Sequence, residues 1–158
     1  MTRFLPFAAV FALIGLTADA TSQPPSAKSS TRPRPKLEAV AETKLLMEAL
    51  LMTNHRGLAR NLSQEKPEAQ ALVFSRGQAL VIAESGNLLM LRPPKSGGTD
   101  EWMELASELR DRGTKLAKAI ADKDLNRSRQ GFSDLTATCN RCHQTFRVPV
   151  RVPLGEKE

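Results

Sequence analysis

The sequence contains few of the groups that most enzymes use for acid–base or nucleophilic chemistry. Its 158 residues include two cysteines, two histidines, one tryptophan, six phenylalanines and no tyrosine. No proton-transfer pair or nucleophile triad is visible, so we expect no enzyme with ordinary substrate turnover. No basic stripe with interleaved aromatics is present, which argues against nucleic-acid binding. Few aromatic and β-branched residues, with many Ala and Leu, favour helices over strands.

The first 36 residues are not typical of a folded core. Residues 1–20 have a basic start, an apolar run from Phe4 to Leu16 and an Ala-Asp-Ala ending, which is typical of a cleaved secretory signal peptide. The run is short for a membrane span, although an uncleaved anchor is the alternative. Residues 21–36 predict a linker rich in Pro, Ser and basic residues. We therefore expect a periplasmic protein with no membrane span after signal cleavage.

Most of the net charge of +6 lies in the linker and not in the predicted folded part. Four positive charges lie in residues 21–36, and the two charged residues of the signal cancel, which leaves a net +2 for residues 37–158. A basic linker could approach anionic lipid or an acidic partner, but a solvated tether is the simpler interpretation.

Apolar residues recur at helical spacing in four segments. We predict helices over 37–62, 67–91, 99–120 and 125–147. Pro67 suits a first turn, and the Pro- and Gly-rich residues 92–98 cannot continue a helix. Four long helices with short connections predict an all-α, antiparallel up-down-up-down four-helix bundle over residues 37–147, with a flexible tail at 148–158.

The apolar stripes predict which sides of the helices face the core. For the first two helices the predicted inner residues are Val40, Met47, Leu51, Leu58, Leu62, Val73, Leu80, Leu88 and Leu91.

Both cysteines and one histidine lie together in the last helical segment, as Cys139-x-x-Cys142-His143. Positions i, i+3 and i+4 share one helix face, so the two thiols and the imidazole point the same way. Two thiols can reach the vinyl groups along one porphyrin edge while the imidazole turns to the iron, which is why this spacing indicates covalent haem. A zinc site would need further ligands, a redox pair would need a βαβ context, and a disulfide would leave the histidine unexplained.

The same segment resembles the cytochrome c-prime family. Members carry C-x-x-C-H-x-x-[FY]-R, which here runs from Cys139 to Arg147, and the preceding "LAKAIADKDLNRSRQGFSDLTATC" and Trp102 are also similar. The resemblance covers residues 37–147. It implies a four-helix bundle with one haem c per chain, held by Cys139 and Cys142, with His143 as the proximal iron ligand. It also implies that Arg147 neighbours the haem, although a solvated charge near a helix end is an equal alternative.

In this family the sixth iron position faces the first helix. A methionine there gives six-coordinate iron suited to electron transfer, and an apolar residue leaves the iron open to gases. Met47 lies on the apolar stripe and is the first candidate for a distal ligand, with Met52 as the alternative. Aligning residues 54–57 with a similar stretch of some gas-binding family members instead places Ala49 at the sixth iron position. Both methionines could also simply fill the core. His55, beside Arg56, is expected to be exposed or partly packed rather than a ligand.

The resemblance therefore implies a periplasmic mono-haem c-type cytochrome acting in electron transfer. The alternative is a five-coordinate haem protein that binds nitric oxide or carbon monoxide, and an alternative of another class is a haem-free helical protein with a cysteine pair or zinc. Its partner would be a redox protein or a small gas. Many relatives dimerise through bundle helices, so a homodimer is possible, although nothing in the sequence requires one.

Overall fold

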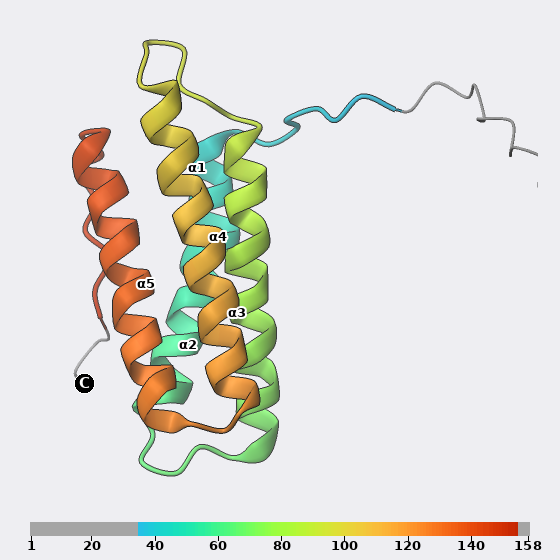
Figure 1. Ribbon diagram of the computed structural model, residues 1–158, viewed down its shortest axis with the longest axis vertical. Helices are drawn as coiled ribbons and strands as arrows, with labels where there is room; N and C mark the ends of the chain where they lie inside the picture. The colour runs from blue at the N-terminus through green and yellow to red at the C-terminus, as the bar shows by residue number, and fades with distance from the viewer. Residues whose placement is uncertain (1–34, 155–158) are drawn as a thin grey trace, which may run out of the picture. The chain divides into compact units, whose positions relative to one another are not determined.

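The computed structural model describes residues 35–154, and each element in that range is helical (Figure 1). The predicted signal peptide and the linker up to residue 34 lie outside the described residues. In chain order the elements are α1 (Thr43–Leu45), the π-helix η1 (Leu46–Met52), α2 (Thr53–Ser63), α3 (Ala69–Met90), α4 (Thr99–Ala121) and α5 (Leu125–Thr145). The all-helical class is confirmed, and none of the described helices is long and apolar enough to cross a membrane.

α1, η1 and α2 follow one another without a break and form one long helix. It begins at Thr43 rather than at Leu37, and Val40, predicted to be an inner residue, is 95% exposed. Residues 37–42 therefore have no core to pack against and gain nothing from continuing the helix. The later part of the first stripe behaves as expected, since Leu51, Leu58 and Leu62 are buried.

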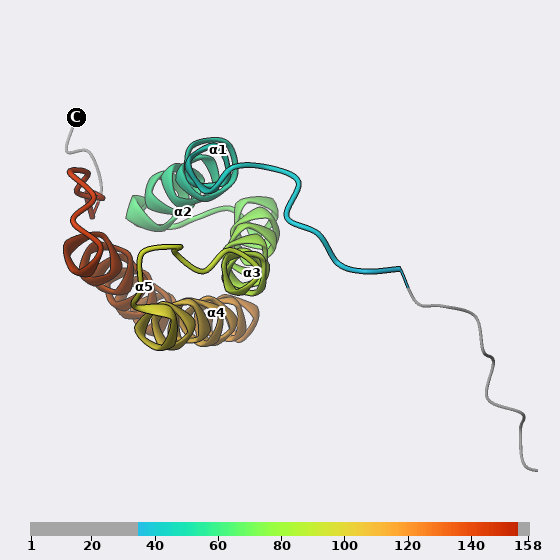
Figure 2. The same ribbon diagram turned by 90° about the horizontal axis from the view of Figure 1, so that it is seen from above.

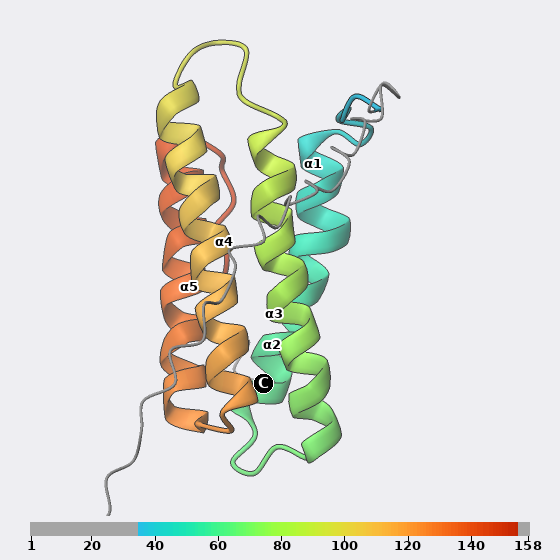
Figure 3. The ribbon, with the colours of Figure 1, turned by 45° about the vertical axis from the view of Figure 1, so that its right-hand side comes forward.

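The helices lie side by side around a shared core (Figures 2 and 3). α3 packs against α4, α4 against α5, and α2 against both α3 and α5, while η1 packs against α3. Glycines let α3 and α4 approach closely. A Cβ added at Gly86 would lie 2.6 Å from the backbone oxygen of Ala106, and one at Gly113 would lie 2.9 Å from that of Ala79.

The inner face of α3 is not the one that its large apolar residues predict. Val73, Leu80 and Leu91 are exposed, whereas the buried face consists largely of small residues: Ser75, Ala79, Ala83, Ser85 and Gly86. The two serine hydroxyls donate to backbone oxygens one turn earlier, at 2.8 Å each, so their burial leaves no unpaired hydroxyl. Close packing against α4 selects small side chains here, and the hydropathy pattern therefore indicates the wrong face.

The corner between α4 and α5 depends on two residues. Lys123 adopts a left-handed conformation (φ 56°) that ends α4, and its backbone N–H donates to the oxygen of Ile120 at 3.0 Å. Asp124 then caps α5, because its carboxylate accepts from the backbone N–H of Arg127 at 3.0 Å. This tight corner fixes where α5, which carries the cysteine motif, begins.

Candidate functional site

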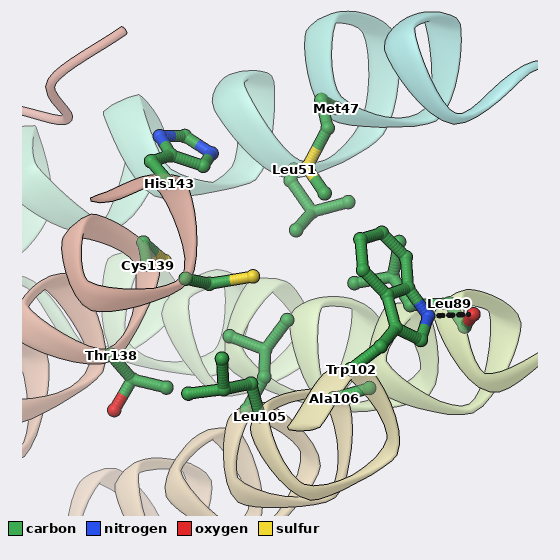
Figure 4. A pocket seen from close by; sticks show the side chains of 11 residues that line it. Met47, Leu51, Leu89, Trp102, Leu105, Ala106, Thr138, Cys139 and His143 are labelled. Atoms are coloured by element: carbon green, nitrogen blue, oxygen red, sulfur yellow. Dashed lines mark hydrogen bonds between the residues drawn. The ribbon is translucent and has the colours of Figure 1, made fainter. Parts of the chain in front are cut away.

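One apolar cavity brings α5 and η1 together. Its walls include Cys139, Cys142 and His143 from α5 and Met47 and Leu51 from η1, as Figure 4 shows for the residues it labels. The rest of the wall is apolar except for Thr138, and comes from α3, α4 and α5. The structure therefore places all three motif residues around one space, facing the helix on which the distal ligand is predicted.

The two cysteines are free thiols, half-buried at this cavity. Burial, with a smaller effect of the neighbouring Cys142, raises the pKa of Cys139 to about 12. Burial also raises the pKa of Cys142, against the opposing charge of Arg141. Because the thiolate is the form that attacks a disulfide, thiols that stay protonated near neutral pH are poorly suited to redox exchange.

The imidazole of His143 is held in one tautomer. Its Nδ1 lies 2.8 Å from the backbone oxygen of Val150. A carbonyl oxygen only accepts hydrogen bonds, so Nδ1 carries the proton, and in the neutral ring Nε2 keeps its lone pair. His143 thus presents the nitrogen that a metal requires.

The helix opposite contains the candidate distal residues. Met47 is half-buried and Leu51 is 8% exposed, and both line the cavity. Met52 is half-buried without reaching the cavity wall, and Ala49 is exposed. These residues belong to η1, and π-helical turns recur at functional sites because they change which side chains face inward.

A comparison with protein families matches residues 98–147 to the family model Cytochrome C'. The match contains α4, α5 and the whole Cys139–Arg147 motif. This match supports a cytochrome c-prime family assignment over residues 98–147. The assignment supports a c-type haem protein, a haem carrier or gas binder rather than an enzyme, and implies covalently bound haem. No curated protein and no solved structure matches the chain.

The donor set fits the haem of a cytochrome c-prime. Two thiols, one imidazole with a free Nε2 and an apolar wall meet at one cavity. The cavity is only about 30 Å³, room for about one or two water molecules. A porphyrin therefore requires the wall to open. η1 packs mainly against α3 and not substantially against α5, so separation of η1 from α5 disturbs little helix packing.

Trp102 forms part of the wall of this cavity. It is 9% exposed, and its indole N–H donates to the backbone oxygen of Leu89 at 2.7 Å. Phe146 meets its ring edge-to-face, with the ring centroids 5.1 Å apart. Trp102 belongs to the apolar core and also lines the cavity, and the half-buried Phe146 packs against that core.

The structure does not place Arg147 on the helix. α5 ends at Thr145, and Arg147 is exposed in a left-handed conformation (φ 54°). Its backbone N–H donates to the oxygen of Gln144 at 3.2 Å, and that of Val148 donates to the oxygen of His143 at 2.8 Å. This is the Schellman arrangement, which reverses the chain after a helix. Arg147 therefore does not continue the helix that carries His143, and it does not line the cavity.

His55 is buried rather than exposed. It is 4% exposed, and its Nε2 lies 2.8 Å from the hydroxyl of Thr136 on α5. That hydroxyl donates to the backbone oxygen of Phe132 at 2.9 Å, so Nε2 is the donor to Thr136. Burial lowers the pKa of His55 to about 4, which keeps the ring neutral. His55 joins α2 to α5 and does not line the cavity.

A polar cluster beside the cavity, unrecognised in the sequence, fixes the motif to α4. Arg141, between the two cysteines, pairs with Glu108. Glu108 also accepts from the hydroxyl of Thr138 at 3.3 Å and lies 3.5 Å from Arg112. The hydrogen bond from Arg141 is the main cause that lowers the pKa of Glu108. No local sequence signal identifies these pairs, because about thirty residues separate Glu108 from its partners on α5.

Proposed function

We propose that this protein is a periplasmic mono-haem c-type cytochrome that transfers electrons, built as an up-down-up-down four-helix bundle. The observation that supports this most strongly is the meeting of Cys139, Cys142 and His143 with Met47 at one apolar cavity. Haem, when bound, supplies the one-electron change between ferrous and ferric iron. The rest of the function depends on what the side chains around it do.

Each motif residue has a distinct role in this proposal. Cys139 and Cys142 would hold the porphyrin through thioether bonds, for which their protonated thiols are available. His143 would bind the iron through Nε2, because Nδ1 is engaged with Val150. The apolar wall would exclude water and so limit the change in solvation that accompanies electron transfer.

Met47 is the proposed second iron ligand. It is the methionine of η1 that reaches the cavity, and Met52 does not. A thioether on the second side of the iron gives a six-coordinate, low-spin centre and raises the reduction potential. Electrons would pass to or from another redox protein that docks where the porphyrin edge is exposed.

Gas binding is the second candidate, and Leu51 is the observation that favours it. Leu51 is more deeply buried than Met47 and lines the same cavity. If Leu51 covers the second side of the iron and Met47 only packs, the iron is five-coordinate and open to nitric oxide or carbon monoxide.

An optical spectrum with carbon monoxide tests the two candidates. The protein is produced with haem-maturation machinery and reduced before the gas is added. Electron transfer with Met47 as ligand predicts a low-spin spectrum that carbon monoxide leaves unchanged. Met47→Leu should then become high-spin and bind the gas, while the matched Met52→Leu should not change.

Three outcomes would contradict the proposal. A wild-type spectrum that is high-spin and shifts with carbon monoxide would favour gas binding. A low-spin spectrum that survives Met47→Leu would mean that another residue binds the iron. Absence of any haem absorption in the wild type would exclude both candidates.

A further inference from the structure

The chain does not end loosely after α5. Residues 148–154, which we name the C-terminal strap, turn back at Arg147 and run beside α5 (Figures 1 and 3). Val152 within it is only 6% exposed. The strap lies beyond residues 98–147, so the family match does not account for it.

Asn140 attaches the strap at two points. Its side-chain N–H donates to the backbone oxygen of Val152 at 2.9 Å, and its side-chain oxygen accepts from the backbone N–H of Val152 at 2.8 Å. One amide side chain thus satisfies both backbone groups of one strap residue, as a neighbouring strand would. Because Asn140 directly follows Cys139 in the sequence, the strap is attached to the part of α5 that carries the cysteine motif.

The attachment sets the position of the atom that holds His143. Asn140 and His143 are three residues apart on α5 and lie on adjacent turns of one face. Along the strap, Val152 and Val150 are two residues apart, and the strap runs opposite to α5. Fixing Val152 on Asn140 therefore places the carbonyl of Val150 against Nδ1 of His143, at 2.8 Å.

We propose that Asn140 is a positioning residue for the iron ligand His143 and acts on it through the C-terminal strap. This inference rests on the proposed haem function. The Val150 carbonyl fixes the Nδ1–H tautomer and the orientation of the ring, and accepting that hydrogen bond makes Nε2 a stronger donor. A stronger donor stabilises ferric iron, so the strap lowers the reduction potential.

The test compares wild type, Asn140→Ala and the control Gln144→Ala, each as the haem-loaded full chain. Gln144 is exposed and adjacent to His143, and its side chain has no hydrogen-bond partner among residues 35–154. Asn140→Ala should keep covalent haem and raise the potential, and in the Met47→Leu background, which should be high-spin, it should also lower the iron–histidine stretching frequency in the resonance Raman spectrum. We expect about a tenfold change in the ferric-to-ferrous ratio at a fixed ambient potential, which is about 59 mV. Gln144→Ala should match the wild type.

A second variant distinguishes the loss of the strap from a folding defect caused by Asn140→Ala. A chain that ends after Val148 lacks residues 149–154 of the strap but keeps the bond from Val148 to His143 that closes α5. It should show the same rise in potential as Asn140→Ala. Wild-type potentials and stretching frequencies in both variants would overturn the proposal.

Failure of the haem hypothesis would be seen separately, as a wild-type chain without haem. In that case ¹⁵N-histidine NMR of the full chain decides about the strap. The Nδ1–H tautomer of His143 in the wild type, and a mixture of tautomers in Asn140→Ala, would support it. The Nε2–H tautomer in the wild type would refute it.

Discussion

Mild acid should destabilise this protein through His55. The ring is 4% exposed, stacks on Phe132 at 4.7 Å between centroids, and donates through Nε2 to Thr136. Burial lowers its pKa from 6.5 to about 4. Between these two values the unfolded chain binds a proton at His55 and the native chain does not, so the free energy of unfolding falls as pH falls.

The magnitude follows from the difference in pKa. A difference of 2.5 units, at about 1.4 kcal/mol per unit, gives a ceiling of about 3 kcal/mol that is reached below pH 4. At pH 5 the loss is about 2 kcal/mol, from the 1.5 units between pH 5 and 6.5. Above pH 6.5 the stabilisation from the neutral ring is complete. Glu108, whose pKa is lowered from 4.5, adds its own loss only at more acidic pH.

Urea denaturation at pH 7, 6 and 5 measures this effect. The control is His55→Gln, whose side-chain amide can still donate to Thr136 but does not titrate. The variant should lose about 2 kcal/mol less than the wild type between pH 7 and pH 5. Equal slopes for the two proteins would refute the claim that His55 is buried and neutral.

Four further substitutions test the backbone and the core by urea denaturation. Arg147→Gly should stabilise the protein by about 0.5–1 kcal/mol, because glycine adopts the left-handed conformation without strain; a loss would mean that the side chain has a structural role. Gly86→Ala should cost about 1–3 kcal/mol, since its Cβ meets a backbone oxygen of α4 at 2.6 Å, whereas Gly77→Ala, with nothing within 4 Å, should stabilise α3 by up to about 1 kcal/mol. Equal effects at the two glycines would contradict the close approach of α3 and α4. Trp102→Phe should cost about 1–2 kcal/mol through the lost hydrogen bond to Leu89, and an unchanged midpoint would show that this bond contributes nothing.

Helical periodicity was sufficient to predict the four helical segments and the shared face of the cysteine motif. Both depend on local spacing, and positions i, i+3 and i+4 face one way wherever the helix packs. The segment 125–147 is therefore nearly right, and Cys139, Cys142 and His143 do meet at one cavity.

The errors arise where distant residues decide the outcome. The buried face of α3 depends on how closely α4 approaches, which favours Ser75 and Ala79 over Val73 and Leu80. The burial of His55 depends on a partner 81 residues away. The spacing of apolar residues along the sequence carries no information about either contact.

The C-terminal tail shows the same limit. Its two prolines and its position after the last helix are typical of a loose end, and the sequence predicts one. Residues 148–154 instead pack on α5, because Arg147 reverses the chain and Asn140 satisfies both backbone groups of Val152. The hydrogen bond from His143 to Val150 follows from that packing and has no signature of its own in the motif.

The covalent attachment of haem at Cys139 and Cys142 is the central claim. Intact mass spectrometry of the denatured, reduced chain, produced with haem-maturation machinery, tests it most directly. We predict a mass increase of one haem that maps to the peptide containing both cysteines and is absent from the Cys139→Ser/Cys142→Ser double variant. An unmodified wild-type chain, or haem that remains covalently bound in the double variant, would contradict it.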